Sequence, residues 1–408
     1  MKKLSLLIAL TLLSAGIALS PSTAKAQDDK QAEFERGWYD ICYTKKPTDV
    51  EKCYQQSKEL VEKYPKSTYI TPAQKNIKGY EQNKAWEKFQ AALKAYYTPP
   101  QNAAKLEQLF SAGDEYLKFD PNHQYVIGQV ALAAANGAMS QIYTNLDKVK
   151  SHAEKGLRTF EPTAPPEGWK PEEWGPLRDI VLAQMNQYLG WQKIETKGNP
   201  EETKANQEQA LNYLTKATQV KGKDGTGWKD PNNYWLRSTI YSSQYPELRK
   251  QYDAMPDDQK TGDAGKEILK RVNDLLDTKL IPEYARVLAT ATKPEAKSLY
   301  DAAKSQFDVY WDFRTGAQDK AADYIKNYVN DPTIAAVPIP VKVETADNLN
   351  APAAPTAAAG NVKLTTGGAP GASGPGGKAS ANGNGKAAPK AAPTKNTKAK
   401  PKPKKRGR

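Results

Sequence analysis

The feature that most constrains the fold is a recurring pattern of two amphipathic segments followed by an aromatic residue and a proline. Apolar residues of the segment 50–64 fall at i, i+3, i+4 and i+7, as one stripe of a helix does. Its end, Tyr64-Pro65, has counterparts at Phe119-Asp120-Pro121 and Phe160-Glu161-Pro162. Since proline cannot continue a helix, each of these sites predicts the end of a helical pair.

Further helical patterns fill the chain up to about residue 332, and no alternating apolar–polar run of useful length competes with them. A helical pair has no partner for its apolar face until another pair stacks on it. The sequence therefore predicts an all-α protein whose residues 27–332 form one α-solenoid.

The helix endings "ELVEKYPKSTY" (59–69) and "EYLKFDPNH" (115–123) resemble those of tetratricopeptide repeats in bacterial cell-envelope proteins, and "YLGW" (188–191) resembles the first helix of such repeats. The resemblance covers about residues 30–220. It implies a right-handed, tetratricopeptide-like solenoid that binds a protein or peptide partner on its concave face. The closing prolines are irregularly spaced, at 65, 121 and 162, unlike the family's roughly 34-residue period.

The N-terminus is typical of a bacterial signal peptide. "MKK" is followed by an apolar run of 16 residues and by small residues at Ala24 and Ala26. We expect residues 1–26 to be a signal peptide that is cleaved after Ala26. The mature protein is then periplasmic or secreted and has no transmembrane span.

The only two cysteines, Cys42 and Cys53, flank a short turn that contains Pro47. They do not form a C-x-x-C redox motif, and no nearby histidine completes a zinc site. In an oxidising compartment they are either a structural disulfide or two buried thiols, and an αα-hairpin favours the disulfide. Thr48 and Glu51 have the spacing of a capping box at the start of the second helix.

The net charge of +13 belongs to the C-terminal tail. Residues 27–347 hold 44 basic residues against all 46 acidic ones, whereas residues 348–408 hold twelve basic residues and no acid. We expect 333–350 to be an extended linker and 351–408 to be a disordered tail rich in Lys, Ala, Pro and Gly. The tail is either a contact for anionic lipids and envelope polymers or a solubilising spacer. Its last basic residues are Lys398, Lys400, Lys402, Lys404, Lys405, Arg406 and Arg408.

Two connections rich in tryptophan are the candidate ligand-binding loops. Their rings and carboxylates suit a glycan or a peptide, although rings at such positions more often cover helix ends. The candidate residues are Trp169, Glu172, Glu173, Trp174, Trp228, Tyr234 and Trp235.

No motif for catalysis, for a cofactor or for a metal stands out. We expect the two histidines, His123 and His152, to be surface residues. The predicted function is a non-enzymatic scaffold at the cell envelope. The alternative is a glycan-binding or glycan-active envelope protein that uses the tryptophan loops. Nucleic acid is disfavoured as a partner, because binding to chromosomal DNA would require a false signal sequence.

Overall fold

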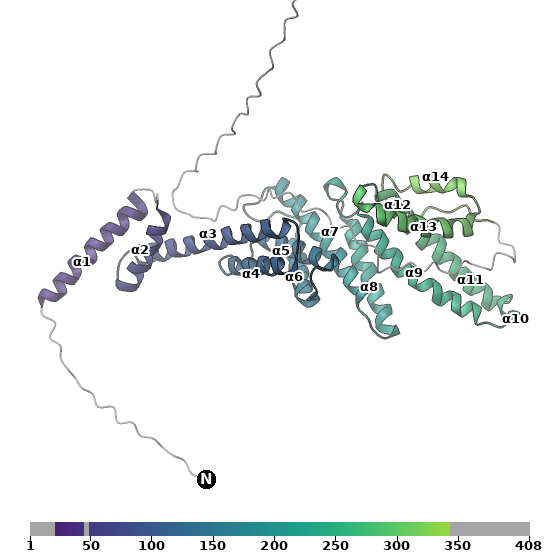
Figure 1. Cartoon of the computed structure of the whole chain (residues 1–408), viewed down its shortest axis with the longest axis horizontal. Helices are drawn as coiled ribbons and strands as arrows, with labels where there is room; N and C mark the ends of the chain where they lie inside the picture. The colour runs from purple at the N-terminus through teal and green to yellow at the C-terminus, as the bar shows by residue number, and fades with distance from the viewer. Residues whose placement is uncertain (1–20, 45–48, 343–408) are drawn as a thin grey trace, which may run out of the picture. The chain divides into compact units, whose positions relative to one another are not determined.

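The computed structural model describes residues 21–44 and 49–342, and this part of the chain is all-helical (Figure 1). An isolated bridge between Lys221 and Gly227 is its only strand-like pairing. The α-helices are α1 (Pro21–Tyr39), α2 (Val50–Lys63), α3 (Ile70–Tyr97), α4 (Ala103–Leu117), α5 (Gln124–Met139), α6 (Leu146–Phe160), α7 (Pro171–Glu195), α8 (Pro200–Gln219), α9 (Pro231–Asp253), α10 (Asp257–Lys260), α11 (Asp263–Leu275), α12 (Ile281–Thr290), α13 (Lys297–Thr315) and α14 (Ala321–Lys326).

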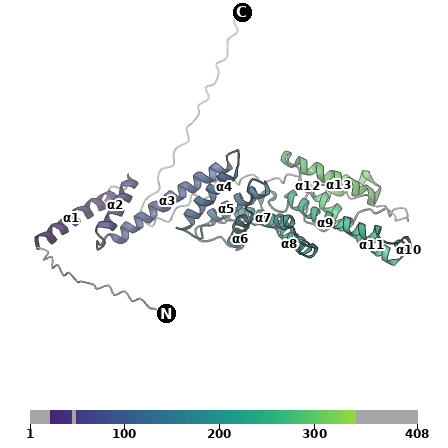
Figure 2. The ribbon, with the colours of Figure 1, turned by 60° about the horizontal axis from the view of Figure 1, so that its bottom comes forward.

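Neighbouring helices in the chain pack against each other, which confirms the predicted helical class. From α5 onward there is a second set of contacts, in which α5 packs on α7, α7 on α9 and α9 on α12 (Figures 1 and 2). Helices α5, α7, α9 and α12 therefore stack in series. Helix α6 packs against α5 and α7, and helix α8 packs against α7 and α9.

The largest core cluster is centred on α5. Every residue of α5 from Tyr125 to Met139 is buried, because small residues let the surrounding helices approach on all sides. A second cluster joins α9, α12 and α13. It includes Tyr284, whose ring stacks on that of Tyr310 with centroids 6.2 Å apart.

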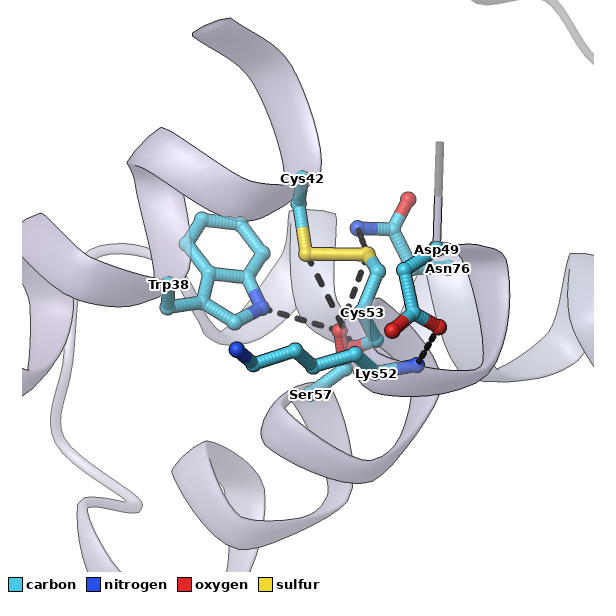
Figure 3. Close-up of a disulfide and its surroundings, with 7 residues drawn as sticks. All are labelled: Trp38, Cys42, Asp49, Lys52, Cys53, Ser57 and Asn76. Carbon is cyan, nitrogen blue, oxygen red and sulfur yellow. Dashed lines mark hydrogen bonds between the residues drawn. A yellow bond between two sulfur atoms is a disulfide. The ribbon is translucent and has the colours of Figure 1, made fainter. Parts of the chain in front are cut away.

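The first hairpin is closed by a disulfide between Cys42 and Cys53, whose Cα atoms are 5.2 Å apart (Figure 3). Cys42 lies in a π-turn, Asp40–Thr44, that follows α1, and Cys53 lies on α2. The indole of Trp38 packs beside the disulfide and donates a hydrogen bond to the hydroxyl of Ser57 at 2.9 Å. Of the two alternatives for the cysteines, the structure has the disulfide.

The predicted cap of α2 is wrong by one residue. Asp49, rather than Thr48, is the N-cap, and its carboxylate accepts a hydrogen bond from the amide of Lys52 at 2.9 Å. Both side chains can cap a helix, so the motif alone did not distinguish the two registers.

Helix α7 begins earlier than the sequence pattern indicated. The prolines of 162–176, which is the connection that contains Trp169 and Trp174, predict a loop, but Pro171 is the first residue of α7 and Pro176 lies inside the helix. Proline suits the first helical position, and Glu172 and Glu173 lie in the first turn, where the helix dipole favours acidic side chains.

Helix α9 also differs from the expectation. The sequence pattern predicts a short helix pair over 232–244 and 245–255, separated near Pro246, but α9 is continuous from Pro231 to Asp253. Proline at this position removes one helical hydrogen bond. The burial of Tyr245, which packs on Tyr310 at 5.6 Å between ring centroids, offsets this loss.

The sequence pattern predicts a long helix over 265–291 that is kinked or broken near Pro282. The helix is not broken there: α11 leads through a π-helical segment, Leu276–Leu280, directly into α12, with Pro282 in its first turn. Further on, residues 332–342 run in extended form along the last helices. The hydroxyl of Tyr324 donates to the carbonyl of Val337, and the amide of Lys342 donates to the carbonyl of Arg314.

In the described part of the chain, no helix has both the length and the apolar character that a membrane span requires. The backbone of α1 includes Ala26, after which cleavage is predicted. Residues 1–20 of the predicted signal peptide, residues 343–350 of the linker and the whole tail 351–408 lie outside the described residues.

The contact between α7 and α8 provides a test of this packing. A Cβ atom on Gly190 would lie 2.7 Å from Cγ of Leu214 and 3.3 Å from the carbonyl oxygen of Ala210. We expect Gly190→Val to lower the free energy of unfolding by about 1–3 kcal/mol, as overpacked cores do. Urea denaturation followed by circular dichroism measures this change.

The matched control is Gly79→Ala on α3, because a Cβ there has no atom within 4 Å. This variant should be more stable by about 0.5–1 kcal/mol, since alanine favours the helix over glycine. Equal stability of Gly190→Val and the unmodified protein would contradict the close approach of α7 and α8.

Candidate functional site

Three of the candidate ligand-binding aromatic residues are part of the core. Trp174 is 1% exposed and stacks on Phe160, with ring centroids 4.8 Å apart. Tyr234 and Trp235 lie in the first turns of α9 and are buried in the core cluster with α12. Their rings stabilise helix packing and do not present a surface to a ligand.

The other residues of the two tryptophan loops remain partly or fully exposed. The indole of Trp169 packs at the edge of the first core and donates a hydrogen bond to Gln124 at 3.3 Å. The ring of Trp228 lies beneath the ammonium groups of Lys229 and Lys221, at 4.6 and 5.4 Å. Glu172 and Glu173 extend from the first turn of α7. The structure therefore does not gather the seven residues into one site.

A cavity of about 560 Å³ lies where α8, α9 and α12 meet the extended segment 332–336. We call it the Arg–Glu cavity, after the side chains at its base. Its volume is within the usual range of small-ligand sites, roughly 300–1,000 Å³. Its lining residues are Thr215, Thr218, Gln219, Lys221, Arg237, Thr278, Lys279, Glu283, Arg286, Pro332, Thr333, Ile334, Ala335 and Ala336.

Two arginines share one carboxylate in this cavity. Oε1 of Glu283 accepts a hydrogen bond from Arg286 Nη1 at 2.8 Å and forms an ion pair with Arg237 Nη2 at 2.8 Å. Glu283 is only 1% exposed, and its Oε2 accepts no hydrogen bond from a described residue. A buried carboxylate of this kind is held by its charged partners.

The two arginines differ in the donors that they have left. Arg286 uses Nε to bind the carbonyl of Pro332 and Nη2 to bind that of Ile334, both at 2.8 Å. It therefore anchors the extended segment. The Nε of Arg237 donates to no described residue.

The charges in the cavity are unequal. Its lining has four basic side chains, those of Lys221, Arg237, Lys279 and Arg286, against the single carboxylate of Glu283. Asp331 neutralises Lys221 at 3.2 Å, but both of these side chains are well exposed and their pair contributes little to stability. The cavity is therefore positively charged and favours an anionic group.

The pKa of Arg237 follows from these surroundings. Burial opposes its charge, but the nearby carboxylate of Glu283 and the hydroxyls of Tyr241 and Tyr234 favour it more strongly. The pKa of Arg237 is consequently raised, and the guanidinium stays charged. Glu283 is held between two guanidinium groups and pairs with both of them.

Sequence reasoning missed this cavity, although one signal for it exists. In the segment "LIPEYARVLA" (280–289), Glu283 and Arg286 are the only charged residues in an otherwise apolar run. A helix that is apolar all round is buried, and a charge inside it needs a partner. The contribution of Arg237, from a helix about 50 residues earlier in the chain, cannot be read from such local spacing.

The basic residues of the tail, Lys398, Lys400, Lys402, Lys404, Lys405, Arg406 and Arg408, lie outside the described residues. Their contact with an anionic surface stays a prediction.

Comparison with protein-family models, with curated proteins and with solved structures found no match to this chain. The resemblance to tetratricopeptide repeats therefore rests on the residues quoted for it alone.

The histidines are less exposed than expected. His123 is the N-cap of α5, where its Nδ1 accepts a hydrogen bond from the amide of Val126, and its ring packs against Tyr116. His152 packs on Phe110 with ring centroids 4.6 Å apart. Burial lowers the pKa of both side chains, although the carboxylates of Asp120 and Asp114 respectively oppose this effect.

These lowered pKa values predict how stability depends on pH. Between about pH 7 and pH 5 the unfolded chain takes up protons on these histidines more readily than the folded chain does. The free energy of unfolding should therefore fall as the pH falls below the unfolded pKa of about 6.5. In the variant His123→Asn, asparagine still caps α5 but has no group that titrates in this pH range. The free energy of unfolding should therefore fall less as the pH falls.

Urea titrations at a series of pH values measure the effect, and His152→Gln gives the second histidine's share. If the pH dependence of both variants equalled that of the unmodified protein, the burial of the histidines would be contradicted.

Proposed function

We propose that this chain is an exported, non-enzymatic helical-repeat binding protein of the bacterial cell envelope. It holds a protein or peptide partner on its helices and recognises an anionic group in the Arg–Glu cavity. The observation that carries the proposal is the excess of positive charge in that cavity, where Glu283 fixes two guanidinium groups. Arginines oriented in this way recognise oxyanions through directed, charge-assisted hydrogen bonds.

The repeat architecture is the second part of the proposal. We take the stacked pairs to be a right-handed, tetratricopeptide-like solenoid. Support comes from the serial contacts of α5, α7, α9 and α12 and from the motif at residues 188–191. Extended surfaces built from such repeats are typical of proteins that bind other proteins.

The location at the cell envelope rests on two features. The first 26 residues have the pattern of a signal peptide, and the Cys42–Cys53 disulfide suits an oxidising compartment. The basic tail would then contact anionic lipids or envelope polymers. The alternative, glycan binding by the tryptophan loops, has less support because Trp174, Tyr234 and Trp235 are buried.

The compartment can be tested through the disulfide. In cells that express the full chain, we expect Cys42 and Cys53 to resist alkylation until a reductant is added, and the N-terminus to begin at Gln27. A variant without residues 2–26 should stay in the reducing cytosol and show both thiols free. Mass spectrometry after alkylation distinguishes these states. Free thiols in the full-length protein, with residues 1–26 retained, would contradict export.

The cavity can be tested with inorganic phosphate as the probe. We expect Arg237→Met to raise the dissociation constant about tenfold or more, because hydrogen bonds to charged groups contribute about 1.5–3 kcal/mol. Arg286 still pairs with Glu283 in this variant, so the carboxylate keeps a partner. Isothermal titration calorimetry on the full chain measures the change.

The matched control is Arg249→Met, on the same helix. Arg249 pairs with Asp253 at 3.0 Å and does not line the cavity. The basic tail is identical in both variants, so any phosphate that it binds cancels in the comparison. Equal loss of affinity in the two variants, or no loss in Arg237→Met, would contradict anion recognition by the cavity.

A further inference from the structure

The Arg–Glu cavity presents two chemically different sets of groups. The first set donates hydrogen bonds. Arg237 lines the cavity with a side chain that is 20% exposed, although its Nε is buried, and the exposed Lys279 extends from the π-helical segment Leu276–Leu280. Glu283 is already paired with both arginines, so it does not neutralise Lys279 as well. Such donors match the oxygens of a carboxylate or a phosphate.

The second set consists of threonine hydroxyl groups, whose oxygens accept hydrogen bonds. The hydroxyl of Thr218 donates its hydrogen to the carbonyl of Thr215 at 2.9 Å, and that of Thr278 donates to the carbonyl of Asp274 at 2.7 Å. The hydroxyl of Thr333 donates to Asp331 in the same way. A hydroxyl has one hydrogen, so these three oxygens can only accept from a ligand.

A carboxylate such as acetate cannot use these acceptors, because it has no hydrogen to give, and hydrogen phosphate has only its one or two P–OH hydrogens. Ligand hydroxyl groups can use them. Cationic donors beside several acceptors therefore select a ligand that combines an oxyanion with hydroxyl groups.

The remaining walls limit the ligand further. Pro332, Ile334, Ala335 and Ala336 form a small apolar side, and no aromatic ring is among the described lining residues. A nucleobase or an aromatic side chain would lack a stacking partner there. The volume of about 560 Å³ is sufficient for a monosaccharide unit.

We propose that the Arg–Glu cavity binds an acidic sugar, with its carboxylate or phosphate at Arg237 and Lys279 and its hydroxyl groups at the threonines. This assignment rests on the proposed function, because it names the ligand class of the same cavity. Sugar acids and sugar phosphates share the required chemistry, and separate titrations distinguish them.

The experiment is isothermal titration calorimetry of the full chain with five probes. Glucuronate is compared with acetate, glucose 6-phosphate is compared with inorganic phosphate, and neutral glucose is the fifth probe. At least one acidic sugar should bind tenfold or more tightly than its simple anion, and glucose should bind at least tenfold more weakly than that acidic sugar. The better of the two acidic sugars identifies the anionic group.

A threonine variant tests the hydroxyl contacts. Thr278→Val should weaken the binding of the acidic sugar about threefold or more and leave the binding of acetate unchanged, because acetate has no hydrogen to donate to Thr278. The matched control is Thr239→Val on α9, since Thr239 makes the same kind of bond to the carbonyl four residues earlier but does not line the cavity. Both substitutions are nearly isosteric, and Thr278 is exposed, so the fold is retained.

The outcomes separate the two proposals. If simple anions bind as tightly as acidic sugars, or if Thr278→Val behaves like Thr239→Val, the sugar assignment fails while anion recognition stands. If none of the anionic probes responds to Arg237→Met, both fail. If glucose binds as tightly as the acidic sugars, the role of the positive charge is overturned.

Discussion

The C-terminal half of the structure depends on one buried carboxylate. Glu283 holds Arg286 of its own helix and Arg237 of α9, and Arg286 in turn fixes the extended segment at Pro332 and Ile334. Removing one partner from a buried ion pair costs roughly 3–5 kcal/mol, because the other charge is left uncompensated. This carboxylate therefore joins α9, α12 and the segment 332–336, and it also positions the donors of the cavity.

The helical class and most of the helices could be predicted from the sequence, because helix periodicity and proline act locally. The amphipathic stripe of α2 is such a local pattern, and it is present. The disulfide followed from the positions of Cys42 and Cys53 on the two arms of a hairpin. Local reasoning was wrong where tertiary packing outweighs the effect of proline, as at Pro176 and Pro246.

The candidate site could not be predicted in the same way. Trp174 is followed by Gly175 and Pro176, and Tyr234 and Trp235 come shortly after Pro231, which indicates loops, but all three lie in the first turns of buried helices. The cavity needs residues from helices about 50 positions apart and from a segment about 50 positions further on. Only Glu283 and Arg286, charged residues in an apolar run, gave a local signal.

The most direct test of anion recognition is to follow the side-chain Nε–H signal of Arg237 by NMR while phosphate is added to the full chain. Our account predicts that this signal shifts and saturates, whereas the corresponding signal of Arg249, on the same helix, stays in place. Shifts confined to the lysines of the tail, with the signal of Arg237 unchanged, would contradict the account.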